Sequence, residues 1–134
     1  MRRRLAALAL STLLAGPAFA ESDTDALRML DQAMIMRSAA TRCAEPSSVR
    51  SAAFRRAYLQ VAAQAQAALK SLASDLTQAH IQSVMADHYD EIDRHVIAII
   101  EQESCGGADI LEALRKYDSL VNSAPSQQIA NKVD

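Results

Sequence analysis

Residues 85–100 read MADHYDEIDRHVIAII, and the spacing of their apolar side chains decides the fold class. These side chains recur in alternating steps of four and three residues: Met85, Tyr89, Ile92, Val96 and Ile99. A mean period of about 3.5 residues is typical of a helix packed against other helices in a left-handed bundle. The stretch therefore predicts a helix with one buried face.

The same spacing recurs in three further segments. Their apolar stripes are Ala26, Met29, Ala33, Met36, Ala40 and Cys43; Phe54, Tyr58, Val61, Ala65, Ala68 and Leu72; and Ile110, Leu114, Tyr117 and Val121. Helix-breaking residues interrupt the pattern at Pro46, at Gly106-Gly107 and at Pro125, with a softer break around residues 71–75. No segment alternates with a period of two, so we predict an all-α fold, a small antiparallel four-helix bundle.

The first twenty residues, MRRRLAALALSTLLAGPAFA, have the three parts of a secretory signal peptide. Three arginines are followed by a short apolar run over residues 5–15 and by a small-residue A-x-A ending at Ala20. The run is too short for a membrane-spanning helix, which needs ~20 residues. We therefore predict cleavage at about Ala20 and export of a soluble protein, periplasmic or secreted.

The chain thus divides into a signal peptide (1–20), one helical domain (21–124) and a polar tail (125–134) that we expect to be mobile. Three of the 14 Lys and Arg lie in the signal peptide and all 16 Asp and Glu follow it, so the mature chain carries a net charge of about −5. This charge argues against nucleic acid, which is bound by clustered positive charge. No second segment is apolar enough to span a membrane. We expect the partner to be another protein or a second copy of this chain.

The two cysteines, Cys43 and Cys105, are predicted to form an intrachain disulfide. They close the first and third helical segments, whose C-terminal ends lie at the same end of an up-down-up-down bundle. A bridge across about sixty residues contributes roughly 4 kcal/mol in the chain-entropy model. We expect Gly106-Gly107 to end the third helix with a left-handed residue. The alternatives are an intermolecular bridge, free thiols or a chemical role for a thiol.

Three residues of the opening stretch, His88, Glu91 and His95, form a ridge at the edge of the predicted buried face. Each neighbouring pair is close enough along a helix to share a metal ion. The two histidines, however, are two turns apart, about 10.5 Å of rise, so both need help from another helix to bind one ion. The ridge therefore predicts histidines packed at a core edge; the alternatives are a divalent metal or pH-sensing site and acid/base catalysis.

Acidic side chains crowd the third segment: Asp87, Asp90, Glu91, Asp93, Glu101 and Glu103. Two interpretations fit them. They form a solvated face, or Glu101 and Glu103 pair with Arg50 and Arg55 at the start of the second helix.

Apolar residues also lie outside the stripes, in VIAII (residues 96–100) and in MIM (residues 34–36). Either these runs lie at the bundle centre or they form a patch for a partner. We therefore mark Met34, Ile97 and Ile100 as a candidate interaction surface.

The sequence contains no catalytic constellation: it has neither a Gly-rich phosphate loop nor a nucleophile elbow, and no carboxylate pair in an identifiable cleft. We therefore expect no enzymatic activity and no cofactor. The expected function is that of an exported protein-interaction, adaptor, inhibitor or chaperone-like module. The alternative is a metal- or ligand-binding bundle that uses His88, Glu91 and His95.

Overall fold

The computed structural model describes the backbone of residues 16–130 and the side chains of residues 22–123. Its four helices are α1 (Gly16–Cys43), α2 (Ser48–Leu72), α3 (Gln78–Glu103) and α4 (Ala108–Ala130). No strand occurs in this part of the chain. The prediction of an all-α four-helix bundle is confirmed.

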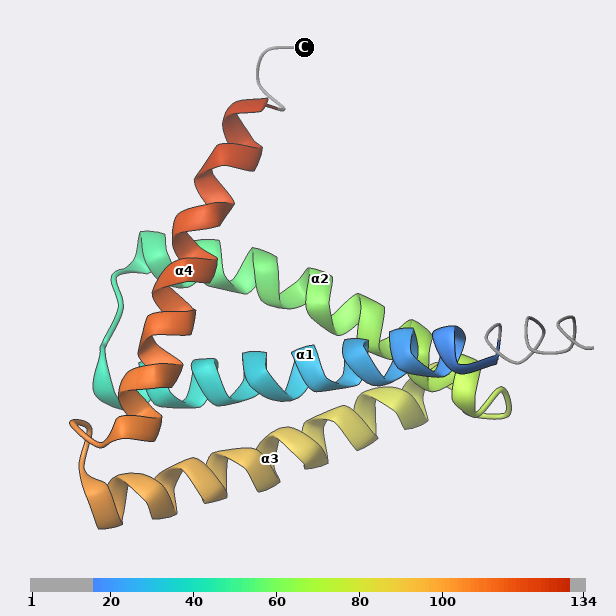
Figure 1. Cartoon of the computed structure of the whole chain (residues 1–134), viewed down its shortest axis with the longest axis horizontal. Coiled ribbons are helices and arrows are strands. Elements are labelled where there is room, and N and C mark those ends of the chain that lie inside the picture. Colours follow the sequence, from blue (N-terminus) through green and yellow to red (C-terminus); the bar gives the residue numbers. More distant parts are fainter. Residues whose placement is uncertain (1–15, 131–134) are drawn as a thin grey trace, which may run out of the picture.

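Helix α1 lies in the middle of the bundle and contacts all three other helices. Figure 1 shows α2 and α3 on opposite sides of α1, with α2 antiparallel and α3 parallel to it, while α4 crosses α1 and α2 near one end. Helices α2 and α3 touch each other only slightly. The architecture is thus an up-down-up layer of three helices, in which consecutive helices run in opposite directions, with a fourth helix laid across it.

Local sequence explains where the middle helices begin. The side chain of Ser47 caps α2 by accepting a hydrogen bond from the amide of Arg50, and Thr77 caps α3 by accepting one from the amide of His80. Both caps satisfy amides that have no partner within the helix. The breaks at Pro46 and Gly106-Gly107 fall between helices, as predicted.

The core consists of three clusters of buried residues, each including residues of α1. Toward α2 and α4, Ala40 packs with Ala53, Phe54, Tyr117 and Val121. The second cluster joins α1 to α2 and contains Leu30, Met34, Ala62 and Ala65, and the third joins it to α3 and α4 and contains Ala39, Val96, Ile110 and Ala113. Because alanines dominate, the helices approach closely but bury little apolar area per residue.

Two methionines of α1 lie where the stripe did not predict them. Met29, a stripe residue, is 47 % exposed, whereas Met34, marked as a candidate surface residue, is only 1 % exposed. The prediction that Met34 belongs to an interaction surface is therefore wrong. Because α1 packs against helices on several sides, its buried surface is wider than one 3.5-residue stripe.

The disulfide between Cys43 and Cys105 is confirmed, with a Cα–Cα distance of 5.6 Å. It ties the C-terminal end of α1 to the turn that follows α3. The predicted left-handed glycine is wrong, because neither glycine of this turn has positive φ and Ser104 instead has φ 65°. The hydroxyl of Ser104 accepts a hydrogen bond from the amide of Gly106, which fixes the turn.

The two predicted end segments are described only in part. Residues 1–15 of the signal peptide and residues 131–134 of the tail lie outside the described residues, whereas residues 16–20 are helical at the start of α1. Helix α4 continues past Pro125 to Ala130, beyond its predicted end. Cleavage near Ala20 and mobility of the tail stay predictions. Within the described part of the chain, none of the helices has the length and apolarity needed to cross a membrane.

Candidate functional site

The structure does not bring His88, Glu91 and His95 together as the ligands of one metal ion. The imidazole Nε2 of His88 lies 2.6 Å from the carboxylate Oδ1 of Asp31 on α1, so this histidine links α1 to α3. Glu91 and His95 are exposed. Among the described residues, no group of three or more His, Cys, Asp or Glu side chains is placed to hold a metal ion.

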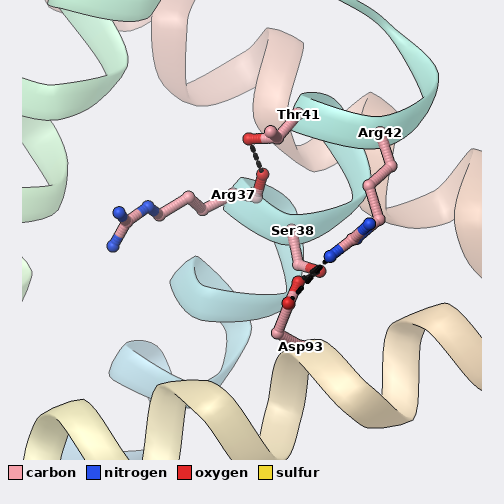
Figure 2. A network of polar contacts seen from close by, with 5 residues as sticks. All are labelled: Arg37, Ser38, Thr41, Arg42 and Asp93. Atoms are coloured by element: carbon pink, nitrogen blue, oxygen red, sulfur yellow. Dashed lines mark hydrogen bonds and ion pairs between the residues drawn. The ribbon is translucent and has the colours of Figure 1, made fainter.

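The acidic face of α3 is also divided. Asp93 turns inward and accepts hydrogen bonds from the hydroxyl of Ser38 at 2.6 Å and from the guanidinium of Arg42 at 2.9 and 3.3 Å (Figure 2). These bonds, from Arg42 first and then Ser38, hold the pKa of Asp93 below its usual value. The network fastens α1 to α3 and leaves no donor of Ser38 unpaired, although that side chain is fully buried.

Of the two interpretations of the acidic residues, the one that pairs Arg50 and Arg55 with Glu101 and Glu103 is wrong. Arg50 pairs instead with Asp118 of α4 at 2.6 Å. The reason is the packing order: α1 separates α2 from α3, and α4 crosses the start of α2.

Arg37 lies on a different side of α1 from this network. Figure 2 shows its side chain pointing away from Ser38, Arg42 and Asp93. Its guanidinium carbon lies 4.4 Å from the ring centroid of Tyr89 and 5.5 Å from that of Tyr58. Both distances are within the range of cation–π attraction, so two aromatic rings hold this cation in place.

Arg37 also lines an aromatic-walled cleft with a volume of about 510 Å³. We call it the arginine–aromatic cleft. It is lined by Arg37, Ala40, Thr41, Pro46, Ser51, Phe54, Arg55, Tyr58, Leu59 and Tyr117. The cleft therefore lies between α1 and α2, under the crossing point of α4, and no acidic side chain lines it.

Aromatic rings form the floor of this cleft. Phe54 and Tyr117 are stacked with centroids 4.5 Å apart, and Tyr58 lies 5.9 Å from Phe54 in a tilted arrangement. Burial raises the pKa of Tyr117, while a hydrogen bond with Ser51 opposes the rise. Phe54 and Tyr117 are almost fully buried, whereas Tyr58 is half-buried, so the floor is rigid and apolar.

The rim of the cleft is positive. Arg37 and Arg55 are both exposed, and neither forms an ion pair with a described side chain. Arg42 and Arg50, by contrast, each bind an aspartate. The cleft thus combines an aromatic floor with two guanidinium groups that are available to an anionic group.

A smaller cavity of about 230 Å³ lies between α1, α3 and α4. His95 lies at its wall with Met36, Val96 and Ile99, and both acidic and basic side chains of α4 complete it. Glu112, one of these, already pairs with Arg115 and Lys116. The mixed and internally paired charges give this cavity no clear preference for a ligand.

The other two candidate surface residues are half-buried. Ile100 packs against the cluster that contains Val96 and Ile110, while Ile97 belongs to none of the three described core clusters. They do not join Met34 in one surface, because Met34 lies in the interior.

Sequence reasoning missed the cleft because its walls come from three helices. One signal was nevertheless present: the chain has only three tyrosines and two phenylalanines. Of these, Phe54, Tyr58 and Tyr117 line the cleft, and Tyr89 lies under Arg37. Rare aromatic residues in an alanine-rich chain therefore indicate where a specific surface lies.

The chain matches no protein-family model, and no curated protein or solved structure shows significant similarity to it.

Proposed function

We propose that the mature chain is an exported, non-catalytic interaction module that binds another protein at the arginine–aromatic cleft. The observation that carries this proposal is the cleft itself, with three aromatic rings and two arginines that have no carboxylate partner among the described side chains. Arginine and aromatic residues are enriched at protein interfaces and dominate their binding energy. The volume is also within the ~300–1,000 Å³ typical of binding sites.

Export is supported by two features of the chain. The N-terminal segment has the composition of a signal peptide, and the Cys43–Cys105 disulfide is of the kind that persists in oxidising compartments such as the periplasm or the extracellular space. Intact-mass measurement of the protein from its native host tests this part. The expected mass is that of residues 21–134 with one disulfide, and a mass that includes residues 1–20 contradicts it.

The alternative, a metal-binding bundle, is not favoured. His88 is engaged with Asp31, and the described residues offer no group of three ligands. For the same reason we assign no catalytic role to the ridge of His88, Glu91 and His95.

Site-specific photo-crosslinking in the native host tests the proposed site. A photoreactive residue at Leu59, which is 57 % exposed at the cleft rim, is expected to yield a discrete adduct with another protein. The matched control is Leu111 on α4, which is 47 % exposed and does not line the cleft.

A blocking substitution completes the test. Thr41→Trp places a large ring in the cleft from an exposed position of α1 and is expected to abolish the Leu59 adduct without removing either arginine. Equal adducts from Leu59 and Leu111, or a Leu59 adduct that survives Thr41→Trp, contradict the proposal. An adduct between two copies of this chain would show that the cleft binds a second copy of this chain instead of a different protein.

A further inference from the structure

We infer that the cleft receives an extended acidic segment of the partner protein, with a carboxylate side chain on Arg37 and Arg55 and an adjacent aromatic side chain on the ring floor. This inference rests on the proposed function and adds the chemistry of the partner. It is carried by charge complementarity, by the fixed position of Arg37 and by the openness of the rim.

The position of Arg37 explains how a carboxylate is recognised. Its guanidinium packs against the rings of Tyr58 and Tyr89 at 5.5 and 4.4 Å from their centroids. A guanidinium that stacks on an aromatic ring can still use the N–H groups in its plane to bind both oxygens of a carboxylate. The rings therefore orient the cation before the partner arrives, which reduces the entropy lost on binding.

The charges around the cleft favour an acidic occupant over a neutral or basic one. Although acidic residues outnumber basic ones in the whole chain, 16 to 14, none of them lines the cleft. Arg55 makes no ion pair with any described side chain, and it lines the cleft together with Arg37. Two like charges at one cleft repel each other, and an anion between them removes that cost.

The shape of the cleft favours a segment of a larger molecule over a free small ligand. Pockets for small ligands bury about 70–90 % of the ligand surface. Here the buried floor of Phe54 and Tyr117 lies below a rim of Arg37, Arg55 and Leu59, all of which are exposed. An occupant therefore buries one side and leaves the other in solvent, as an extended peptide does.

Capped pentapeptides titrated into the isotope-labelled, disulfide-bonded protein and followed by NMR test the inference. The probe Gly-Glu-Phe-Glu-Gly is expected to shift the amide signals around Arg37 and Arg55. Its neutral counterpart Gly-Gln-Phe-Gln-Gly is expected to bind roughly tenfold more weakly, because charge-assisted hydrogen bonds are lost. Gly-Glu-Ala-Glu-Gly, which lacks the ring, is expected to bind more weakly as well.

Matched arginine variants separate the cleft from general charge. Arg55→Gln is expected to weaken binding of the Glu-containing peptide but not of the Gln-containing one. Arg94→Gln, on the exposed face of α3, is expected to change the binding of neither peptide. Because Arg55 is exposed and forms no ion pair with a described side chain, its replacement is expected to leave folding intact, which melting curves check.

Four results overturn the inference: equal binding of the Glu and Gln peptides, indifference to Arg55→Gln, no shift at the cleft at millimolar peptide, or equally tight binding of free 3-phenylpropionate. The last result makes a small carboxylate the occupant. None of these results affects the proposed function, which the Leu59 crosslink tests independently.

Discussion

The carboxylate of Asp93 accepts a hydrogen bond of 2.6 Å from the hydroxyl of Ser38, a side chain with no exposed surface. The same carboxylate pairs with Arg42, so one residue of α3 holds two residues of α1 that are one helical turn apart. Asp93 therefore has a structural role, although most of the acidic residues around it on α3 are exposed. Asp93 binds Ser38 and Arg42 on one side of α1, whereas Arg37 lies on another side of this helix and lines the cleft.

The Asp93 network leads to a prediction about stability. Asp93→Ala is expected to lower the free energy of unfolding at neutral pH by about 1–3 kcal/mol, because it leaves a buried hydroxyl without its acceptor. Urea denaturation measures this loss. Asp90→Ala, an exposed neighbour on the same helix, serves as the control and is expected to change stability by less than about 0.5 kcal/mol.

The lowered pKa of Asp93 adds a pH dependence to that prediction. A lowered pKa in the folded state means that the stabilisation is fully present above the unfolded pKa of about 3.9 and is lost as the pH falls through the folded value. The difference between wild type and Asp93→Ala should therefore shrink as the pH falls below about 4. A difference that stays constant over this range contradicts the role of the charged carboxylate.

The disulfide is expected to contribute about 4 kcal/mol, because Cys43 and Cys105 are separated by 62 positions and the bridge restricts a long loop in the unfolded chain. Denaturant unfolding of the oxidised protein and of the double variant Cys43→Ser/Cys105→Ser measures the contribution. Reductant should destabilise only the oxidised wild type. Equal stability of the two proteins would show that the helical packing alone sets the fold.

The two glycines before α4 are predicted to respond differently to alanine. A Cβ at Gly107 would lie 2.7 Å from the Cβ of Glu103, whereas a Cβ at Gly106 meets nothing closer than 3.7 Å. Gly107→Ala is therefore expected to cost about 1–3 kcal/mol through overpacking, and Gly106→Ala is expected to be nearly neutral. Thermal melts of the two variants provide the comparison, and equal melting temperatures would rule out the close contact at Gly107.

Two methionines of α1 test the position of the core. Met34→Ala is expected to destabilise the protein by about 2–5 kcal/mol, because the side chain is only 1 % exposed. Met29→Ala, at a side chain that is 47 % exposed, is expected to change stability by less than about 0.5 kcal/mol. The order would be reversed if the single stripe read from the sequence described the buried face of α1.

Zinc is expected to leave the melting temperature unchanged, because the described residues provide no three-ligand group. Differential scanning fluorimetry with and without zinc measures the effect. A rise in melting temperature that disappears in His88→Gln would instead restore the ridge as a metal site.

Much of the fold was predictable because helix packing follows local periodicity. The stripe through Tyr89, Ile92 and Val96 on α3 faces the core as predicted, with Val96 only 1 % exposed. The disulfide was predictable because two cysteines close helices that end on the same side of an up-down arrangement. For α1 the same reasoning failed, since a helix surrounded by three others buries residues outside any single stripe.

By itself the sequence determined the helical class, the main breaks between helices, and the Cys43–Cys105 pairing, because each depends on short-range spacing or on the order of the helices. Only the tertiary structure decided that Met34 is interior, that Asp93 binds Ser38, and that Arg37 and Arg55 share a cleft with three aromatic rings. The physical reason is the crossing of α4 over α1 and α2, which brings Tyr117 against Phe54 although 63 positions separate them along the chain. Periodicity records which face of a helix is apolar, but the angle at which two faces meet depends on all of their side chains together.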